Sequence, residues 1–365
     1  MRKHPFILVF FLKITFVFSQ NTFVEFNPPH LIWLNDKERK ALSNNQSSEA
    51  KFFKKEILEN AKRHLKENPN PIDSIFYEGF MSNNPKRIES SAHLKDLKSI
   101  YYLNWAYIFT QNHIYAQKTK AFLLSWAKTY QPTGNDVNEN KLAICFYAYE
   151  TVKSVLSDDE NEVIEKWLDK IAKKQIENWN PNSGSSNRHV KRAKLILLGG
   201  IALENSKFKD FALQKIDTLL NYAILPDGKT QDLIRRDAMH YHVDCLITFM
   251  EVNYLTKLLD IDLFHKKSLK NASISNCLEF LKPYFRGEKI HKEWINTTVG
   301  LDKKRWKSGD EFYKPGKIWD PSEGIPLLIL TKKYDKAIEN IFETKFKNQV
   351  SEEDKFTDWL LSFKK

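Results

Sequence analysis

Apolar side chains recur every three or four positions along most of the chain, which is the spacing of amphipathic helices. Phe53, Ile57, Ala61 and Leu65 repeat in this way within residues 48–67, and the following Asn-Pro-Asn-Pro run is a typical stop signal. The same pattern predicts further helices over residues 96–111, 114–130, 188–204, 206–223, 230–259, 270–282, 326–346 and 352–363.

Helix ends are marked as clearly as helix faces. Ser157 followed by Glu160 is a capping-box pattern, and it predicts the start of a helix that ends at the polar loop 180–186. The run 132–136 (Pro-Thr-Gly-Asn-Asp) is a breaker that ends the helix before it. Residues 285–324 show no clear period, so we expect loops and short strands there.

About ten helices joined by short turns predict an all-α fold, an array of antiparallel hairpins that could close into a ring. Glycine supplies only 11 of 365 residues, which argues against propellers and sandwiches with their many tight turns. No Pro/Ser-rich linker interrupts the array, so we expect residues 20–365 to form a single domain.

The N-terminus resembles a secretory signal peptide. Arg2 and Lys3 precede an apolar stretch interrupted by Lys13, and the small residue Ser19 follows. We expect cleavage of residues 1–19 and a periplasmic or secreted protein. The apolar stretch is too short for a membrane span of about 20 residues, so we expect no stable membrane insertion after cleavage.

The charge of the chain indicates an anionic partner. Lysine and arginine number 57 against 46 acidic residues, and removing the N-terminal segment leaves a net charge of +8. Nucleic acid, acidic membrane and acidic polysaccharide all fit a basic surface, but export disfavours nucleic acid. The three cysteines, Cys145, Cys245 and Cys277, are too few for a disulfide framework, and we expect buried thiols.

One polar cluster, Asn187-Arg188-His189, lies where the Ser/Gly loop meets a predicted helix. A helix N-terminus attracts a carboxylate and disfavours a protonated imidazole, so His189 could act as a base at neutral pH. The alternative is that His189 is an ordinary solvent-facing residue of the first turn.

A second cluster, residues 235–244 (RRDAMHYHVD), crowds ionisable side chains onto one predicted helix. Arg236 and His240 would share one face at i,i+4, and Arg235 and His242 would be nearly in phase at i,i+7. Such a helix borders a cleft or is an ion-paired surface helix. Zinc is not expected because His240 and His242 point to different sides and no HExxH spacing occurs.

At these residues the chain resembles the alginate lyase superfamily of polysaccharide lyases. Residues 227–242 (DG…RDAMHYH) are similar to its "DG…RDALHYH" signature, and residues 132–139 to its "PTGNPIDE". Glu78-Gly79, the aromatic helix 121–127 and residues 283–291 (PY..GEKIH) follow the family order. The similarity extends over about residues 75–320.

The resemblance implies an incomplete (α/α) toroid that cleaves a uronate-containing polysaccharide, such as alginate or glucuronan, by β-elimination without a cofactor or metal. It implies that Asn187 and an arginine, preferably Arg236, neutralise the substrate carboxylate, that His189 is the base and that Tyr241 is the acid. Tyr241 could also be the base if the flanking Arg235, Arg236 and His240 lower its pKa. Substrate-binding positions would be Arg235, His240, His242, Arg188 and His291.

The chain departs from the family pattern in two places. Arg188 separates Asn187 from His189, whereas the best-known branch has Asn and His adjacent, and another branch has its His at the position of Lys191. The early tyrosine of the family has Tyr77 and Tyr101 as its candidates here.

Two rival functions remain open at this stage. A glycoside hydrolase would depend on two carboxylates such as Asp136 and Asp237. A non-catalytic glycan-binding protein would stack sugar rings on exposed tryptophans, with Trp105, Trp126, Trp294 and Trp306 as candidates. For a polyuronate lyase, residues 285–324 would contribute to the selectivity among polyuronates.

Overall fold

The computed structural model describes residues 30–180 and 186–363. The predicted signal peptide, residues 1–19, lies outside the described residues. Within them the only extended pairings are two isolated bridges, Ile224 with Thr230 and Lys292 with Ile318. The prediction of an all-α fold with an irregular segment near 285–324 is therefore confirmed.

Helical hairpins make up the N-terminal half. Its helices are α1 (Asp36–Ser43), α2 (Ser48–His64), α3 (Pro85–His93), α4 (Asp96–Thr110), α5 (His113–Thr129), α6 (Asp136–Asn140), α7 (Ala143–Val152) and α8 (Asp158–Glu177). Helix α4 packs against α2, α5 and α7, and α8 packs against α5. The predicted capping box is present at Ser157 and Glu160.

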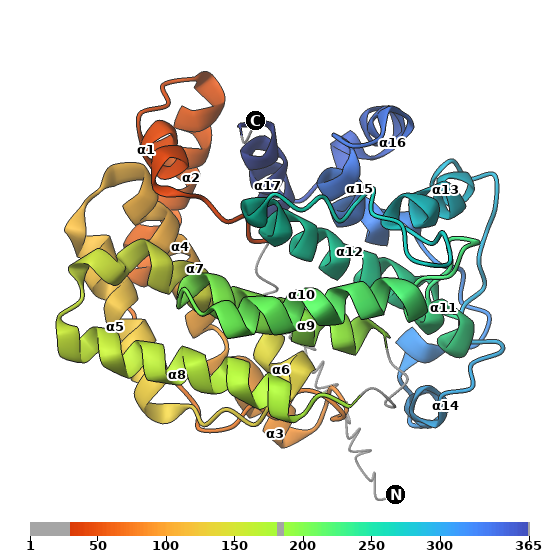
Figure 1. Cartoon of the computed structure of the whole chain (residues 1–365), viewed down its shortest axis with the longest axis horizontal. Helices are drawn as coiled ribbons and strands as arrows, with labels where there is room; N and C mark the ends of the chain where they lie inside the picture. The colour runs from red at the N-terminus through yellow and green to blue at the C-terminus, as the bar shows by residue number, and fades with distance from the viewer. Residues whose placement is uncertain (1–29, 181–185, 364–365) are drawn as a thin grey trace, which may run out of the picture.

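The C-terminal half continues the same arrangement. Its helices are α9 (Ser186–Ala202), α10 (Ser206–Tyr222), α11 (Gln231–Arg236), α12 (Met239–Thr256), α13 (Ile274–Phe285), α14 (Gly300–Lys307), α15 (Ile325–Thr331), α16 (Lys336–Ile341) and α17 (Glu352–Phe363). Figure 1 shows α9, α10 and α12 side by side across the middle of the molecule, with α5 and α8 on one side and α13 to α17 on the other.

The helices form two layers around a cleft, which is the arrangement of an incomplete (α/α) toroid. Helices α2, α4, α7, α9, α12 and α17 contribute side chains to the cleft. Among the described residues, α5, α8 and α10 contribute none to it, and they pack on the outside of α4 and α9. The pairs α4–α5, α7–α8 and α9–α10 thus each supply one inner and one outer helix.

Helix α7 is a helix that the periodicity did not predict. Eight of its ten residues are buried, so it lacks the polar face that makes an amphipathic pattern visible. Helix α4 is also buried almost all round, but its flanking polar turns marked its ends. The three cysteines are buried free thiols, as expected.

The long helix predicted over 230–259 is wrong in one respect, because it is broken at Asp237. Asp237 adopts a left-handed backbone conformation (φ 50°) and ends α11, and Ala238 is extended before α12 begins. Arg236 and His240 therefore do not share a helix face. The break separates the two arginines from the His-Tyr-His run and turns them in a new direction.

Residues 286–324 are held by backbone hydrogen bonds to this break. Trp294 donates its N–H to the Asp237 carbonyl at 2.7 Å, and Thr298 donates to the Arg235 carbonyl at 2.8 Å. The segment contains α14 and two short 3₁₀ turns, η4 (Glu311–Tyr313) and η5 (Pro321–Gly324). The helix predicted over 326–346 is likewise divided into α15, α16 and a π-helical turn, Phe342–Phe346.

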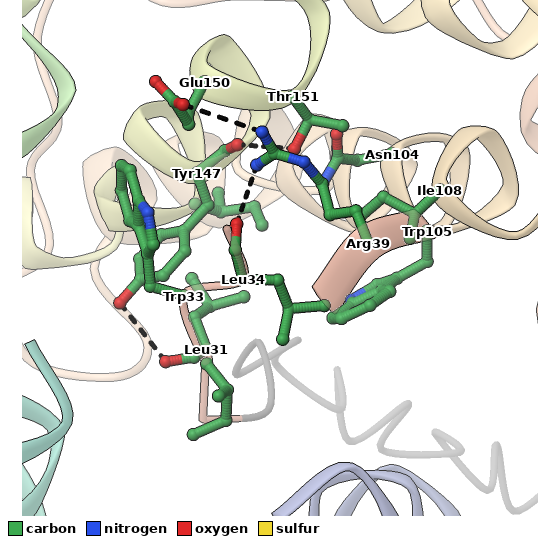
Figure 2. Close-up of a pocket in the computed structure, with 12 residues that line it drawn as sticks. Leu31, Trp33, Leu34, Arg39, Asn104, Trp105, Ile108, Tyr147, Glu150 and Thr151 are labelled. Carbon is green, nitrogen blue, oxygen red and sulfur yellow. Dashed lines mark hydrogen bonds and ion pairs between the residues drawn. The ribbon is translucent and has the colours of Figure 1, made fainter. Parts of the chain in front are cut away.

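The segment before α1 is fixed to the inner helices around a small cavity of about 20 Å³ (Figure 2). Arg39 donates to the Leu34 carbonyl at 2.8 Å, and the Tyr147 hydroxyl donates to the Leu31 carbonyl at 3.2 Å. Trp33 packs on Tyr147. None of the helices in the described part of the chain is both long and apolar enough to cross a membrane.

Candidate active site

A cleft of about 1790 Å³ runs between the inner helices. Eleven lysine or arginine side chains and seven acidic side chains line it, so it carries a positive excess that suits a polyanion. The cavity of Figure 2 is far smaller and is lined mainly by apolar side chains. The cleft is therefore the candidate active site.

Helix α9 presents Asn187 and Lys191 to the cleft, one turn apart. Both side chains reach the same carboxylate on α12: Asp244 accepts from Asn187 Nδ2 at 3.1 Å and from Lys191 Nζ at 2.5 Å. The Asn187 backbone N–H donates to Asp232 at 2.7 Å. Lys191 lowers the pKa of Asp244 despite its burial, and Asp244 raises the pKa of Lys191, so both are charged.

Arg188 also lines the cleft, but two acids hold it. Its guanidinium lies 2.7 Å from Asp136 and 3.4 Å from Glu78. Arg192 approaches the second oxygen of Asp136 at 3.4 Å. Asp136 and Glu78 therefore fix the loop segments around 78 and 136 against α9.

The two arginines before the break differ in their surroundings. Arg236 forms a bidentate pair with the fully buried carboxylate of Asp302, with 3.0 Å between Arg236 Nε and Asp302 Oδ2, and its guanidinium lies 3.5 Å from the centre of the Tyr241 ring. Arg235 is exposed at the cleft, and no acidic side chain pairs with it within the described ranges.

Tyr241 lies in the cleft wall on the first turn of α12. Its hydroxyl is 3.2 Å from the Tyr313 hydroxyl, and Trp294 packs edge-on against its ring. Burial raises the pKa of Tyr241, while Arg236, the hydrogen bond with Tyr313 and Arg305 oppose that rise. Of the flanking residues expected to lower the pKa of Tyr241, only Arg236 does so. Burial outweighs this effect, and the net shift of the pKa is upward.

His240 lines the cleft next to Tyr241. Its Nδ1 atom is 3.1 Å from Glu323, and its backbone N–H donates to Glu293 at 2.9 Å. Burial raises the pKa of Glu293. His240 thus lies at the cleft, as predicted, and Glu323 is the acid that pairs with its ring.

Three predicted histidines, His189, His242 and His291, are not part of the cleft lining. His189 is 2% exposed; its Nε2 is 2.8 Å from the Asn180 carbonyl, its Nδ1 is 3.1 Å from the Tyr222 hydroxyl, and its ring stacks on Trp179. Burial is the main cause that lowers the pKa of His189. The structure therefore argues against His189 as the base.

His242 and His291 are turned away from the cleft as well. His242 is completely buried between Thr230 and Phe280, and burial lowers its pKa to about 3. His291 Nε2 is 3.3 Å from the Asp237 carbonyl. His291 contacts the break between α11 and α12, and His242 bonds to Thr230 at the start of α11, so the structure gives both a structural place rather than a substrate contact.

Sequence reasoning gave little weight to four cleft residues. Tyr77 lines the cleft, accepts from Arg87 at 2.8 Å and lies under Lys141, whereas Tyr101 belongs to the core. Lys191 was noted only as a departure from the family pattern, although its i,i+4 spacing from Asn187 would have revealed it. No sequence signal pointed to Arg305 or Tyr313.

The residues required by the two rival functions are not brought together. Asp237 accepts from the Asn296 backbone and side chain and is not among the cleft-lining residues, so it forms no pair with Asp136 there. Trp105, Trp126 and Trp294 are buried, and Trp306 packs on the Trp294 cluster. In the described part of the chain, no group of three His, Cys, Asp or Glu side chains is arranged to hold a metal ion.

Comparisons with known proteins show the family and the fold. The sequence matches the alginate lyase family model over residues 41–291, and no curated protein sequence matches it significantly. An alginate lyase from Bacteroides ovatus has a similar structure, with a TM-score of 0.62 and 17% identity, covering 86% of this chain and 95% of that one.

A second solved structure with this fold is alginate lyase A1-III from Sphingomonas species A1, with a TM-score of 0.53, 17% identity, and coverage of 69% of this chain and 76% of that one. A variant of that protein in complex with a tetrasaccharide has a TM-score of 0.54 at the same identity and coverage.

Proposed function

This chain belongs to the alginate lyase family and is a polysaccharide lyase, and from that membership we propose that it cleaves alginate by β-elimination at Tyr241. The observation that carries the proposal is the position of Tyr241. It is a phenol in the wall of a basic cleft, with guanidinium groups next to it and an amide–lysine pair on the neighbouring helix α9.

The chemistry requires three groups. Removing the C5 proton of a uronate leaves negative charge on the adjacent carboxylate, so that carboxylate must be neutralised. A base must reach C5, and an acid must protonate the leaving oxygen on C4. A basic cleft with one phenol can supply all three.

We assign carboxylate neutralisation to Asn187 and Arg235, and we assign to Lys191 the neutralisation of Asp244 beside Asn187. Arg235 suits this role better than Arg236, because the Arg236 guanidinium is already committed to Asp302 and the Tyr241 ring. Asp244 orients the Asn187 amide nitrogen and Lys191 together. Arg236 then acts on Tyr241, where its charge favours the phenolate.

We assign both proton transfers to Tyr241. The phenolate takes the C5 proton, the C5–H electrons form the C4–C5 double bond, the C4–O4 bond breaks, and the new phenol returns the proton to O4. One group can do both only if H5 and O4 lie on the same face of the sugar. They do so in β-D-mannuronate and in glucuronate, and they lie on opposite faces in α-L-guluronate. We therefore propose a preference for mannuronate blocks.

The test is ultraviolet absorbance of the conjugated uronate product, measured with polymannuronate, polyguluronate and glucuronan. Absorbance should grow most with polymannuronate, and Tyr241→Phe should reduce the rate by about 10²–10⁴-fold, the usual contribution of acid–base catalysis. Reducing ends without absorbance would indicate hydrolysis. Binding without product from any polymer would contradict the enzymatic assignment of the cleft.

We also propose that the protein acts in the periplasm or outside the cell. The proposal is supported by the signal-like N-terminus and by the size of a polymeric substrate, which does not cross a membrane unaided. Expressing the full-length chain and sequencing the N-terminus of the mature product tests it. A product that starts at Gln20 supports export, and an uncleaved product in the cytoplasm contradicts it.

A further inference from the structure

Tyr241 contacts a second tyrosine that lies beyond the matched family region. Tyr313 ends the 3₁₀ turn η4, 22 residues past the end of the match at 291. The two hydroxyl oxygens are 3.2 Å apart, and both residues line the cleft. The segment 286–324 therefore contributes directly to the surroundings of the proposed proton-transfer group.

A third residue favours Tyr313 as the donor in this hydrogen bond. Arg305 Nη1 on α14 donates to the Tyr313 oxygen at 2.5 Å. Because a guanidinium has donors only, the Tyr313 oxygen is an acceptor there, and its own hydrogen is available for the Tyr241 oxygen. Burial and the charge of Tyr241 raise the pKa of Tyr313 far above its ordinary value, so Tyr313 keeps its proton and Tyr241 is the phenol that ionises.

Packing keeps the two hydroxyls in register. The Trp294 ring lies 4.9 Å from the Tyr313 ring and 5.7 Å from the Tyr241 ring, measured between centres. Trp294 has a left-handed backbone conformation (φ 65°), which a bulky residue rarely adopts. Its N–H bond to Asp237 holds it there.

The charged and titratable groups around Tyr241 come from several elements. Arg236 on α11, Arg305 on α14 and the Tyr313 hydroxyl favour its ionised form, whereas Asp302 on α14 opposes it. His240 precedes it on α12 and pairs with Glu323. On the neighbouring helix α9, Lys191 is neutralised by Asp244 of α12. Tyr313 is the hydrogen-bond partner of the Tyr241 hydroxyl in this set.

We propose that Tyr313, held by Arg305, is a positioning residue of the lyase reaction that donates a hydrogen bond to the Tyr241 phenolate and stabilises it. This inference rests on the proposed role of Tyr241. A hydrogen bond to a charged oxygen is stronger than one to a neutral oxygen, so Tyr313 favours the form of Tyr241 that accepts the C5 proton.

The experiment compares Tyr313→Phe, Arg305→Met and the double variant over a range of pH on polymannuronate. Phenylalanine keeps the ring that packs on Trp294 and removes only the hydroxyl. We expect kcat at neutral pH to fall about tenfold, KM to stay within about twofold, and the rising limb of the pH–rate profile to move to higher pH. The matched control is Tyr149→Phe, whose hydroxyl bonds to Asn161 and Glu165 outside the cleft.

The double variant tests whether Arg305 acts through Tyr313. If it does, the double variant loses less activity than the product of the two single losses. A superimposable pH profile for wild type and Tyr313→Phe would overturn the proposal. So would a rise in KM with unchanged kcat, because that result would make Tyr313 a sugar contact.

A second readout needs no substrate. The ultraviolet titration of tyrosinate in wild type minus that in Tyr241→Phe gives the ionisation of Tyr241, and the same difference in the Tyr313→Phe background should move to higher pH. If this shift occurs while wild type cleaves no polyuronate, the contact stands and the proposed function fails. If wild type is an active lyase and neither the profile nor the titration moves, only the role of Tyr313 is refuted.

Discussion

The two sides of the cleft near Tyr241 are built in different ways. One side is the α9–α12 wall, where Asn187, Lys191 and Asp244 are placed by regular helix spacing. The other side is the segment 286–324, where Arg305 and Tyr313 are placed by turns, short helices and bonds back to the α11–α12 break. Catalytic groups on the first side depend on helix packing, and those on the second depend on a few polar contacts.

The two sides of the cleft should therefore respond differently to mutation. Removing a side chain from the α9–α12 wall leaves two long helices with buried apolar faces in place, so the effect should be local and chemical. The segment 286–324 has a small core of its own around Trp294 and Tyr313. Removing one of its polar anchors should loosen the segment and reduce stability and activity together.

Asp302→Asn should give the largest combined effect. It removes the charge partner of Arg236 and weakens the bond from Thr297, leaving a largely buried guanidinium uncompensated. We expect the free energy of unfolding to fall by about 3 kcal/mol and kcat to fall as well, because Arg236 is then no longer fixed over the Tyr241 ring. Chemical denaturation and the absorbance assay measure the two effects.

The matched control for this prediction is Asp310→Asn in the same segment. Asp310 caps η4 through the Phe312 N–H, and asparagine caps nearly as well as aspartate. We expect a change in stability below about 0.5 kcal/mol. If both variants behave alike, the Arg236–Asp302 pair is not the anchor of the segment.

Lys191→Met should give a large effect on rate and a smaller loss of stability than Asp302→Asn, because 31% of the Asp244 side chain is exposed. It removes a cation from the cleft and leaves the Asp244 charge unpaired beside Asn187, where it repels the substrate carboxylate. We expect kcat/KM to fall about 10–100-fold and Lys191→Arg to restore much of it. Steady-state kinetics on polymannuronate provides the measurement.

Lys194→Met is the control on the same helix. Lys194 also lines the cleft and also pairs with an acid of α12, Glu251, at 2.7 Å, but it is one turn further from Asn187. A loss below about threefold is expected from the removal of one cleft charge. Equal losses for the two lysines would mean that the cleft responds only to net charge.

The sequence predicts those helices whose apolar residues follow a helical period. Ranges such as 206–223 and 352–363 nearly coincide with α10 and α17, because an amphipathic stripe is visible in a single sequence. The break at Asp237 was missed because no glycine or proline marks it. An aspartate in a left-handed conformation there depends on tertiary contacts, including the bonds from Asn296.

The site residues also divide into those that local sequence patterns predict and those that tertiary contacts place. Asn187 and Tyr241 were predicted from local motifs, and both lie in the cleft. His189 was chosen by residue type, but its i,i+2 spacing from Asn187 turns it to the opposite side of α9, whereas i,i+4 selects Lys191. Arg305 and Tyr313 could not be predicted, because long-range contacts with α11 and α12 place them.

His189→Gln tests whether His189 of α9 has a structural role rather than a catalytic one. If His189 is structural, the loss of its contacts with Asn180, Tyr222 and Trp179 should lower the free energy of unfolding by about 1–3 kcal/mol. The kcat of the folded variant should stay within about threefold of wild type. A loss of 10²-fold or more with an unchanged melting temperature would restore His189 as the base.

The smallest effect expected at neutral pH comes from His242, on the buried side of α12 next to Tyr241. The folded state holds the pKa of His242 at about 3, whereas an unfolded histidine has a pKa of about 6.5. Below pH 6.5 the unfolded state therefore binds the extra proton, and the free energy of unfolding falls by up to about 1.4 kcal/mol per pH unit from this residue until pH approaches 3. Above pH 6.5 His242 contributes no pH dependence to the free energy of unfolding.

His242→Gln removes the titrating group, so its denaturation midpoint should depend less on pH between 6.5 and 4 than that of wild type. Identical slopes would mean that water reaches the imidazole and that the wall behind Tyr241 is less tightly packed than the segment that faces it.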